Sequence, residues 1–510
     1  MLFKIKSKSN NLKVINTHNS QKGFLKTHSI LKSIPNWKIY VMTVLSCLCI
    51  AFLICKENDI LFFGLTLIMV LAVIIFSRPE IGAMLYIFLV VTVFNVATMP
   101  SIKLPGLGQL YVPDLVLIYV LVVLILRYPR SKLIQSPLTL PLFIYFSIRV
   151  VTDIYSTIAV GELKPLFTQL RAELPLLIFF VLISAGRQNR SWVSIVRYLC
   201  FCGIFMAVFY FYAAITRNQQ LLSSPIFWLR SDVDITQGEV PRIVALGMPI
   251  IYPLFFLLFA WTLFSKKLKI RFGTSILTIC FAMLIIFHGF RGLWYSTAAA
   301  LLLIFVSVII KRKVISKGLF LIVIAVVIFS LLSILSPHLP ISNSFKSVIP
   351  RTLSLFDFNN PDFSFFGRFE ELQWGWPLIL ARPILGWGVN VPPNPIFLKT
   401  GLVTPFVHIG YESLLLNYGF LGLFAFLWLI GVYFKYTWRT LMLLHDPFQR
   451  GLILGFMGYT AQLLLASLTN PGVAETSGVV LLILGFTITV LLGDQIQKAR
   501  ISKLREQRLF

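Results

Sequence analysis

The chain has 510 residues and a formal net charge of +26; 57% of its residues are hydrophobic and only 13% are charged. A soluble protein carries about a quarter charged residues, so the mean hydropathy of +0.86 excludes a soluble globular enzyme, a disordered chain and a collagen-like fibre. Near-continuous apolar runs such as Ile60–Phe76 also exclude a β-barrel, because barrel strands alternate apolar and polar residues. The composition predicts an all-α polytopic integral membrane protein.

Apolar runs long enough to cross a membrane recur along the chain. A hydrocarbon core of about 30 Å requires roughly 20 apolar residues per helix. We expect 12 to 14 transmembrane helices, with candidates centred on residues 39–55, 60–76, 81–98, 112–127, 138–152, 174–186, 195–215, 243–264, 274–289, 292–310, 318–335, 409–434, 452–468 and 477–493. The fifth and sixth are the weakest, because Arg149 interrupts one and the other has only thirteen residues.

Charged residues divide unequally between the two sides of this arrangement. The first 38 residues hold eight lysines and no acid, so the positive-inside rule places them in the cytoplasm. Fourteen alternating spans then put 31 of the 45 Lys and Arg residues inside, but only 4 of the 19 acids. We therefore expect cytoplasmic tails at 1–38 and 494–510 and transmembrane helices over 39–335 and 408–493. This division explains the basic charge without a nucleic-acid partner.

The longest connection, 336–407, is expected on the outside. It holds ten of the 26 prolines and several tryptophans, a composition that argues against disorder. Four of its apolar side chains recur at helical spacing, namely Phe369, Leu372, Trp376 and Ile379. We expect an amphipathic helix over 367–381 on the membrane surface, with a simple structural cap as the alternative. Shorter external loops are expected at 153–173 and 216–242.

Two ionisable residues are expected at the outer ends of spans. Arg291 lies between two apolar helices, where a positive charge opposes the orientation bias. It is either a turn residue that snorkels to lipid headgroups or an anion clamp, because guanidinium makes forked bonds to phosphate oxygens. His408 lies where the long loop re-enters the membrane, and an imidazole can accept a proton near neutral pH. A purely structural histidine is the alternative.

Carboxylate pairs provide little support for a metal site. Glu57 and Asp59 lie in one short external loop, and Asp232 and Asp234 lie in another. Such pairs can hold Mg²⁺ or Mn²⁺ with a diphosphate, but short wet loops often have the same composition. The six cysteines all lie in apolar runs and indicate no redox chemistry. No phosphate-binding loop is present in the sequence, so ATP hydrolysis is not indicated.

Several short stretches resemble the O-antigen ligase and O-antigen polymerase family of bacterial envelope enzymes. They are Phe290-Arg291-Gly292 before a helix of small residues, Gly367-Arg368 through Trp374, Ala381-Arg382-Pro383, Gly386-Trp387-Gly388, and His408 with Tyr411, Leu414 and Gly419-Phe420-Leu421-Gly422. Pro241-Arg242, at the mouth of a span, is a weaker match. The matches lie between about 240 and 435. The sequence departs from the family pattern at Ile409, where Asn is usual, and at Phe290, where a small polar residue is usual.

The resemblance implies a glycosyltransferase of the bacterial inner membrane. Its donor would be a glycan on undecaprenyl diphosphate in the outer leaflet. Its acceptor would be a sugar hydroxyl on another lipid-linked glycan, on lipid A core or on another envelope polymer. The implied partners are these two substrates and membrane lipids. Polymerase and ligase both remain open, as do the sugar, the anomeric outcome and the oligomeric state.

The resemblance also suggests roles for the candidate residues. His408 would be the general base for the acceptor hydroxyl. Arg291, with Arg242 and Arg368, would bind the diphosphate and stabilise its developing charge, so that neither a metal nor another cofactor is needed. Direct displacement would invert the anomeric centre. Candidate sugar contacts are Trp374, Trp376, Trp387 and Tyr411; anchoring at the membrane interface explains the tryptophans equally well.

Three other functions compete with this interpretation. A transporter of a small anion such as bicarbonate would place charge near the bilayer midplane, whereas the candidates cluster at one face. A metal-dependent glycosyltransferase with a lipid-monophosphate donor would use Glu57 and Asp59 as ligands. A non-catalytic scaffold for envelope assembly is the third.

Overall fold

The computed structural model describes residues 59–93, 101–104, 108–127, 136–161, 163–189, 192–216, 248–287, 290–309, 363–398 and 404–507. The chain divides after Ser77 into two compact units. Helix α3 (Asp59–Ser77) is the described part of the first unit. All other described elements belong to the second unit.

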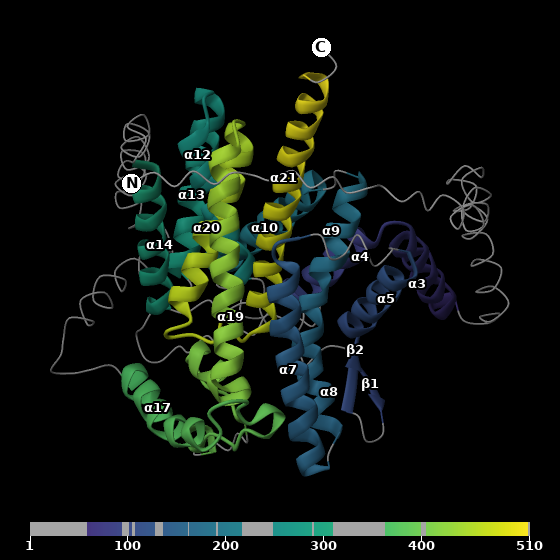
Figure 1. The fold of residues 1–510 in the computed structure, drawn as a ribbon, viewed down its shortest axis with the longest axis vertical. Coiled ribbons are helices and arrows are strands. Elements are labelled where there is room, and N and C mark those ends of the chain that lie inside the picture. Colours follow the sequence, from purple (N-terminus) through teal and green to yellow (C-terminus); the bar gives the residue numbers. More distant parts are fainter. Residues whose placement is uncertain are drawn as a thin grey trace, which may run out of the picture. The chain divides into compact units, whose positions relative to one another are not determined.

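The second unit consists mainly of helices (Figure 1). The α-helices are α4 (Pro79–Phe88), α5 (Val112–Arg127), α7 (Thr139–Val160), α8 (Leu163–Glu173), α9 (Ile178–Asn189), α10 (Trp192–Thr216), α12 (Met248–Phe264), α13 (Leu268–Phe287), α14 (Arg291–Ile309), α17 (Phe363–Ala381), α18 (Pro395–Leu398), α19 (Gly410–Leu443), α20 (Pro447–Ala466) and α21 (Thr476–Gln507). Short helical turns of other types are η1 (Leu89–Val93), η2 (Leu174–Leu177) and η5 (Gly388–Asn390).

A small antiparallel hairpin precedes α5. Strand β1 (Ser101–Leu104) pairs with β2 (Gly108–Tyr111), and Ser101 lies opposite Tyr111. Gly108 has a φ of 99°, a conformation that glycine adopts without strain. Among the described residues, this two-stranded hairpin is the β-sheet, and the other regular elements are helices.

Five of the described helical segments are long and apolar enough to cross a membrane. They are Thr139–Ala159, Leu163–Arg187, Leu268–Ile286, Gly410–Leu443 and Thr476–Gln507. Twelve of the fourteen predicted spans coincide with described helices, whereas 39–55 and 318–335 lie outside the described residues. The prediction of an all-α polytopic membrane protein is thereby confirmed.

The predicted external loop at 153–173 is wrong. Helix α7 continues to Val160, and α8 starts at Leu163 after a turn in which Gly161 has a φ of 80°. Charged residues had lowered the hydropathy of this region and so truncated the predicted spans. In the structure one of them, Glu173, pairs with Arg149 inside the protein.

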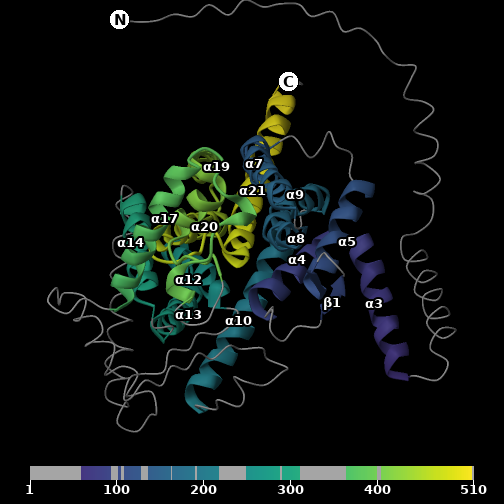
Figure 2. The ribbon, with the colours of Figure 1, turned by 90° about the horizontal axis from the view of Figure 1, so that it is seen from below.

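The helices pack in two groups, one around α12 and α20 and one around α19. Helix α12 contacts α10, α13 and α20, and α20 in turn contacts α14. Gly455 of α20 permits this close approach, because a Cβ there would lie 2.7 Å from Cα of Leu257. Helix α19 packs against α7 and α21, and Figure 2 shows α7, α19 and α21 side by side.

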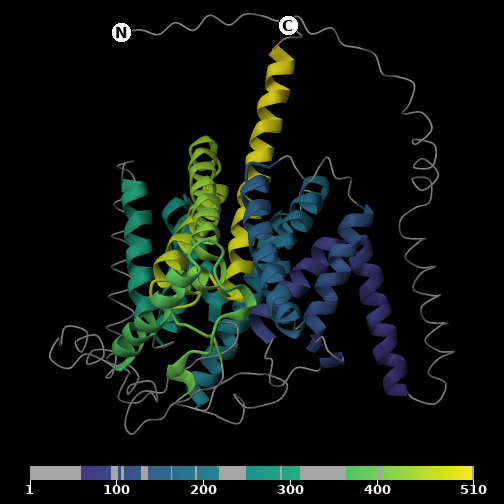
Figure 3. The same ribbon diagram turned by 60° about the horizontal axis from the view of Figure 1, so that its bottom comes forward.

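Polar and irregular segments gather at one end of the second unit. Helix α17 and the β1–β2 hairpin lie at the end opposite the C-terminus of α21 (Figure 1). At the other end, α21 extends beyond its neighbouring helices (Figure 3). The end that carries α17 holds the candidate site.

Candidate functional site

His408 lies in the extended segment just before α19 and pairs with a carboxylate from α17. Its Nδ1 is 2.7 Å from Oε1 of Glu371, and its backbone N–H donates to Oε2 of the same residue at 3.1 Å. The Glu371 side chain is 1% exposed, whereas the His408 side chain is 43% exposed. Because a carboxylate accepts a hydrogen bond from Nδ1–H, the other ring nitrogen, Nε2, is the one that can act on a substrate.

Two aromatic rings restrict the imidazole. Phe397 of α18 stacks on it with ring centres 5.7 Å apart, and Phe406 meets it edge to face at 5.2 Å. These contacts, together with Glu371, hold the ring on three sides. The site therefore contains a partly exposed imidazole in a fixed orientation, which is the arrangement that general base catalysis requires.

The sequence of α17 explains how Glu371 reaches His408. Glu371, Gly375 and Ile379 recur every four residues and form the buried face of the helix. Ile379 packs in a cluster with Val391, Val407 and Leu416. Ile379 therefore does not share an apolar stripe with Phe369, Leu372 and Trp376 as predicted. The exposed stripe contains those three residues and Leu380.

The loop between α20 and α21, residues 467–475, joins several parts of the site. The Nε of Arg368 donates to the carbonyl oxygen of Thr469 at 2.9 Å. The backbone N–H of Gly410, two residues after His408, donates to Ser467 O at 2.9 Å and to Asn470 O at 3.2 Å. The α20–α21 loop thus connects the arginine of α17 to the start of α19.

Arg291 is the first residue of α14, and the helix starts against the same loop. A Cβ added to Gly292 would lie 2.3 Å from Oγ1 of Thr469, so the glycine allows the backbone of α14 to approach the loop closely. The structure therefore brings the backbone at position 291, Arg368 and the His408 segment to one loop. Arg242 lies outside the described residues.

The end of this loop carries an acidic residue, Glu475. Its side chain is accessible, yet the protein atoms around it desolvate the carboxyl group and raise its pKa above the ordinary value. Among the described residues, no group of three or more His, Cys, Asp or Glu side chains could hold a metal ion. Glu57, Asp232 and Asp234 lie outside the described residues.

The candidate sugar contacts lie in different surroundings. The Nε1 of Trp387 donates to Leu378 O at 2.9 Å, and the guanidinium of Arg382 lies 4.1 Å from the centre of its ring. Trp374 packs against the buried cluster beside α17. The hydroxyl of Tyr411 donates to Leu464 O at 2.9 Å. These residues are engaged in protein contacts, whereas Trp376 is 51% exposed.

Helix α19 bends at Gly419, which has a φ of 62°. The segment 382–390 supplies the hydrogen-bond partners that the bend requires. Phe420 N donates to Pro383 O at 2.7 Å, and Trp387 N donates to Leu416 O at 2.8 Å. The Pro-x-x-Gly-x-Gly and Gly-x-x-Gly patterns seen in the sequence thus fit into each other at this bend.

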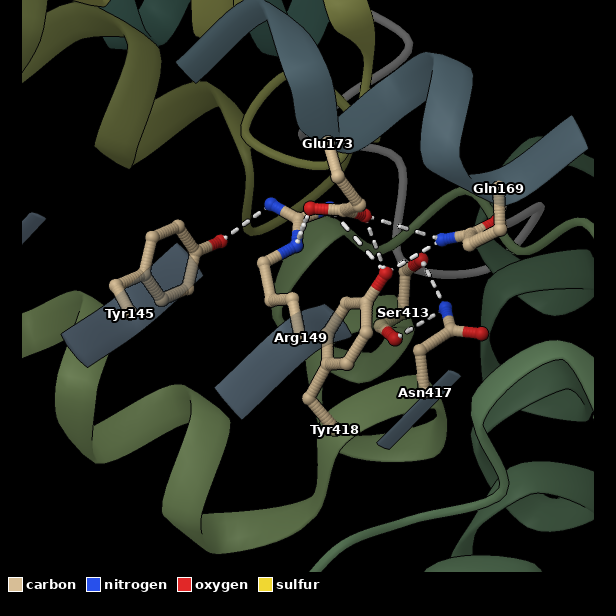
Figure 4. A network of polar contacts seen from close by, with 7 residues as sticks. All are labelled: Tyr145, Arg149, Gln169, Glu173, Ser413, Asn417 and Tyr418. Atoms are coloured by element: carbon tan, nitrogen blue, oxygen red, sulfur yellow. Dashed lines mark hydrogen bonds and ion pairs between the residues drawn. The ribbon is translucent and has the colours of Figure 1, made fainter. Parts of the chain in front are cut away.

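A cluster of mostly buried polar residues surrounds Tyr418, the residue before the bend (Figure 4). We call it the ion-pair cluster; it consists of Tyr145, Arg149, Gln169, Glu173 and Tyr418. Arg149 and Glu173 form an ion pair, and their side chains are 2% and 0% exposed. The Tyr418 hydroxyl donates to Oε1 of Glu173 at 2.6 Å and accepts from the amide of Gln169. Arg149 Nη1 donates to Tyr145 at 2.7 Å.

Sequence reasoning missed both glutamates. Glu371 is three residues after Arg368, a spacing that places them on one face of a helix. That spacing could have indicated that Glu371 lies beside Arg368. It could not show that Glu371 would pair with His408, 37 positions later. Glu173 was assigned to a loop, so its pairing with an arginine inside a span was not considered.

Its fold defines the chain as a multi-pass helical membrane protein with a polar site at one end. Residues 276–427 match the family model described as O-antigen ligase, which supports assignment of the chain to the O-antigen ligase and polymerase family. The matched region includes α17, Glu371 and His408. This family implies an enzyme of the membrane glycosyltransferase type. No curated protein matches the chain.

Proposed function

We propose that the protein is a polymerase-like or ligase-like glycosyltransferase that transfers a glycan from an undecaprenyl diphosphate donor to a sugar hydroxyl. The contact between His408 and Glu371 carries this proposal. It supplies a base with a defined free nitrogen inside the region that matches the O-antigen ligase family. The enzyme works at the outer face of a bacterial inner membrane, with both termini in the cytoplasm.

In the proposed reaction, Nε2 of His408 takes the proton of the acceptor hydroxyl. The hydroxyl oxygen forms a bond to the anomeric carbon of the donor sugar. The bond from that carbon to the diphosphate oxygen breaks, its electron pair leaves with the lipid diphosphate, and the anomeric centre inverts. Glu371 stabilises the imidazolium that forms and holds the ring in the tautomer that exposes Nε2.

The charge that develops on the diphosphate requires cationic partners. Arg291 and Arg368, with Arg242, bind it and stabilise the transition state without a metal. The convergence of α14, α17 and the His408 segment on the α20–α21 loop supports this grouping. Trp376 and Tyr411 are candidates for contact with the sugar, whereas Trp374 and Trp387 act mainly in packing.

The decisive experiment replaces His408 by Ala in cells that depend on this chain for surface glycan. Polymer formation should fall at least ~100-fold, as is typical for loss of a general base, while membrane insertion stays normal. His445→Ala is the matched control, because His445 is an exposed histidine at the other end of α19. Full activity of the His408→Ala variant would remove the proposed base.

A second variant tests the diphosphate clamp. Arg291→Lys keeps the charge but loses the forked geometry, so it should be severely impaired. Parental activity in this variant would contradict the clamp.

Deletion of the gene, followed by analysis of glycans, separates the two acceptor classes. Single repeat units on the normal acceptor would identify a polymerase. Long chains that remain on the lipid carrier would identify a ligase.

A further inference from the structure

The ion-pair cluster has a cost that the proposed reaction does not explain. Arg149 and Glu173 lie in helices that qualify as membrane spans, and both side chains are almost completely buried. Desolvation of two charges is expensive, and a hydrophobic pair of similar volume is often as stable or more stable. Ionisable residues at membrane depth tend to have a functional role. The cluster neither contacts His408 directly nor has the exposure that a substrate would need.

The bonds of the cluster converge on one side chain of α19. The Tyr418 hydroxyl binds Glu173 and Gln169, both on α8, and Arg149 Nη2 of α7 at 3.4 Å. The guanidinium carbon of Arg149 also lies 4.6 Å from the centre of the Tyr418 ring. Figure 4 shows the hydroxyl pointing between the side chains of α7 and α8. The α7–α8 hairpin therefore holds α19 at Tyr418.

Helix α7 also holds the segment that fills the bend of α19. Ser156 Oγ accepts a hydrogen bond from Val389 N at 3.1 Å, and Ser156 O accepts one from the side chain of Asn390. Gly388 packs directly on Ser156, since a Cβ there would lie 2.3 Å from its Oγ. The α7–α8 hairpin, the segment 382–390 and α19 thus form a closed ring of contacts.

Tyr418 occupies the position next to the bend. It is followed at once by Gly419, where the backbone leaves helical geometry. The first turns of α19, from Gly410 to Tyr418, form a short lever with His408 at its far end. These nine residues of helix span about 13 Å, so a small rotation at Gly419 would move the imidazole by an ångström or more.

We infer that Tyr418, held by Arg149 and Glu173, is a positioning residue for His408: it fixes the angle of the first two turns of α19 and thereby sets Nε2 toward the acceptor hydroxyl. This role rests on the proposed function of His408. It gives the buried ion pair a purpose in catalysis beyond the stability of the helix bundle.

The test uses Tyr418→Phe in the full-length protein in nanodiscs. This variant keeps the ring under the guanidinium and removes only the hydroxyl. We expect kcat, measured with lipid-linked glycan extracted from the producing cells, to fall roughly tenfold, because misplacement of a reacting group is costly. The donor KM should stay within about twofold, as for a change in geometry rather than in binding. The thermal midpoint should fall only modestly, because the buried Glu173 carboxylate loses one of its three donors.

A second readout reports the geometry directly and needs no substrate. Diethyl pyrocarbonate modifies exposed imidazoles, and mass spectrometry can compare His408 with the exposed His445 in the same sample. Release of the lever should raise the relative modification rate of His408 at least about threefold, because Phe397, Phe406 and Glu371 now shield its ring. An unchanged rate together with an unchanged kcat would overturn the inference.

Tyr433→Phe is the matched control. Tyr433 is equally buried on α19, but it lies beyond the bend and packs against Phe486 of α21. Its variant should leave both readouts unchanged.

If Tyr418→Phe fails to fold, Gln169→Leu removes one bond to the same hydroxyl and should shift both readouts in the same direction. Loss of activity in His408→Ala with no effect of Tyr418→Phe would reject only the lever, whereas an active His408→Ala would reject the base itself.

Discussion

Two buried glutamates serve the same helix, α19, in different ways. Glu173 binds Arg149, Tyr418 and Gln169, and the Arg149–Glu173 pair itself is closed to solvent. Glu371 is just as buried, but its partner His408 is nearly half exposed and keeps one ring nitrogen available. In the proposed mechanism, one acid fixes the position of a helix and the other supports a reaction.

The chemistry of the two partners explains the difference. A guanidinium stays protonated at any physiological pH and offers several donors in a rigid fork, so it suits a permanent contact. An imidazole gains and loses a proton near neutrality, so it suits a step in which a proton moves. We expect variants of the closed pair to change stability and variants of the open pair to change rate.

The largest effect is expected from Arg149→Met. This variant leaves Glu173 buried without its cation, which typically costs about 3–5 kcal/mol. Thermal unfolding of the purified protein, followed by size-exclusion fluorescence, should show a large loss of folded material. Arg149→Met combined with Glu173→Leu should recover most of it, because an apolar pair needs no charge compensation.

Arg187→Met is the control for that measurement. Its ion pair with Asp494 is 16% and 19% exposed, and partly exposed pairs contribute at most about 1 kcal/mol. Equal losses in the two arginine variants would mean that the ion-pair cluster has no special importance.

Glu371→Gln comes next and should act on rate. The amide has nearly the same shape but cannot stabilise the imidazolium, so kcat should fall about 10- to 100-fold with a normal thermal midpoint. Glu370→Gln, one residue earlier on the exposed face of α17, should keep parental kcat. A stability loss without a rate loss in Glu371→Gln would contradict the comparison of the two pairs.

The bend of α19 provides a test of intermediate size. Gly386 has a φ of 70°, and a Cβ there would lie 2.7 Å from backbone atoms of Asn417. Gly386→Ala should therefore destabilise the protein by about 1–3 kcal/mol, measured as a lower thermal midpoint. Gly431→Ala, further along α19 with no atom near its Cβ position, should be neutral or stabilising.

Hydropathy was sufficient to predict most of the helices, because the spacing of apolar residues depends only on local sequence. The same measure failed at 153–173, where Arg171 and Glu173 were interpreted as loop charges. A window of hydropathy cannot recognise that Glu173 is neutralised by Arg149, 24 positions away. The prediction of His408 as base remains a prediction, and its carboxylate partner came from α17, a contact that only tertiary structure reveals.

The family patterns were recognised as short motifs without a physical reason for their order. The structure supplies one for Pro383, Gly386 and Gly419, which lie together at the bend of α19. It also supplies a polar partner for His408, namely Glu371, in a chain that has Ile409 where the family usually has Asn. The interpretation of Trp387 as a sugar contact remains a prediction; the structure adds that its indole N–H donates to Leu378 O, a contact that the sequence could not reveal.

The smallest effect is expected from Asp153→Asn. Asp153 is fully buried one turn after Arg149, yet within the described part of the chain neither of its carboxyl oxygens has a hydrogen-bond partner. An amide there removes no hydrogen bond of the carboxyl group, so the free energy of unfolding should stay within about 0.5 kcal/mol of the parent or rise. Glu173→Gln makes the same chemical change where three donors depend on the carboxylate. It should cost several times more, and equal effects would show that proximity to Arg149, rather than hydrogen bonding, decides what a buried carboxylate contributes.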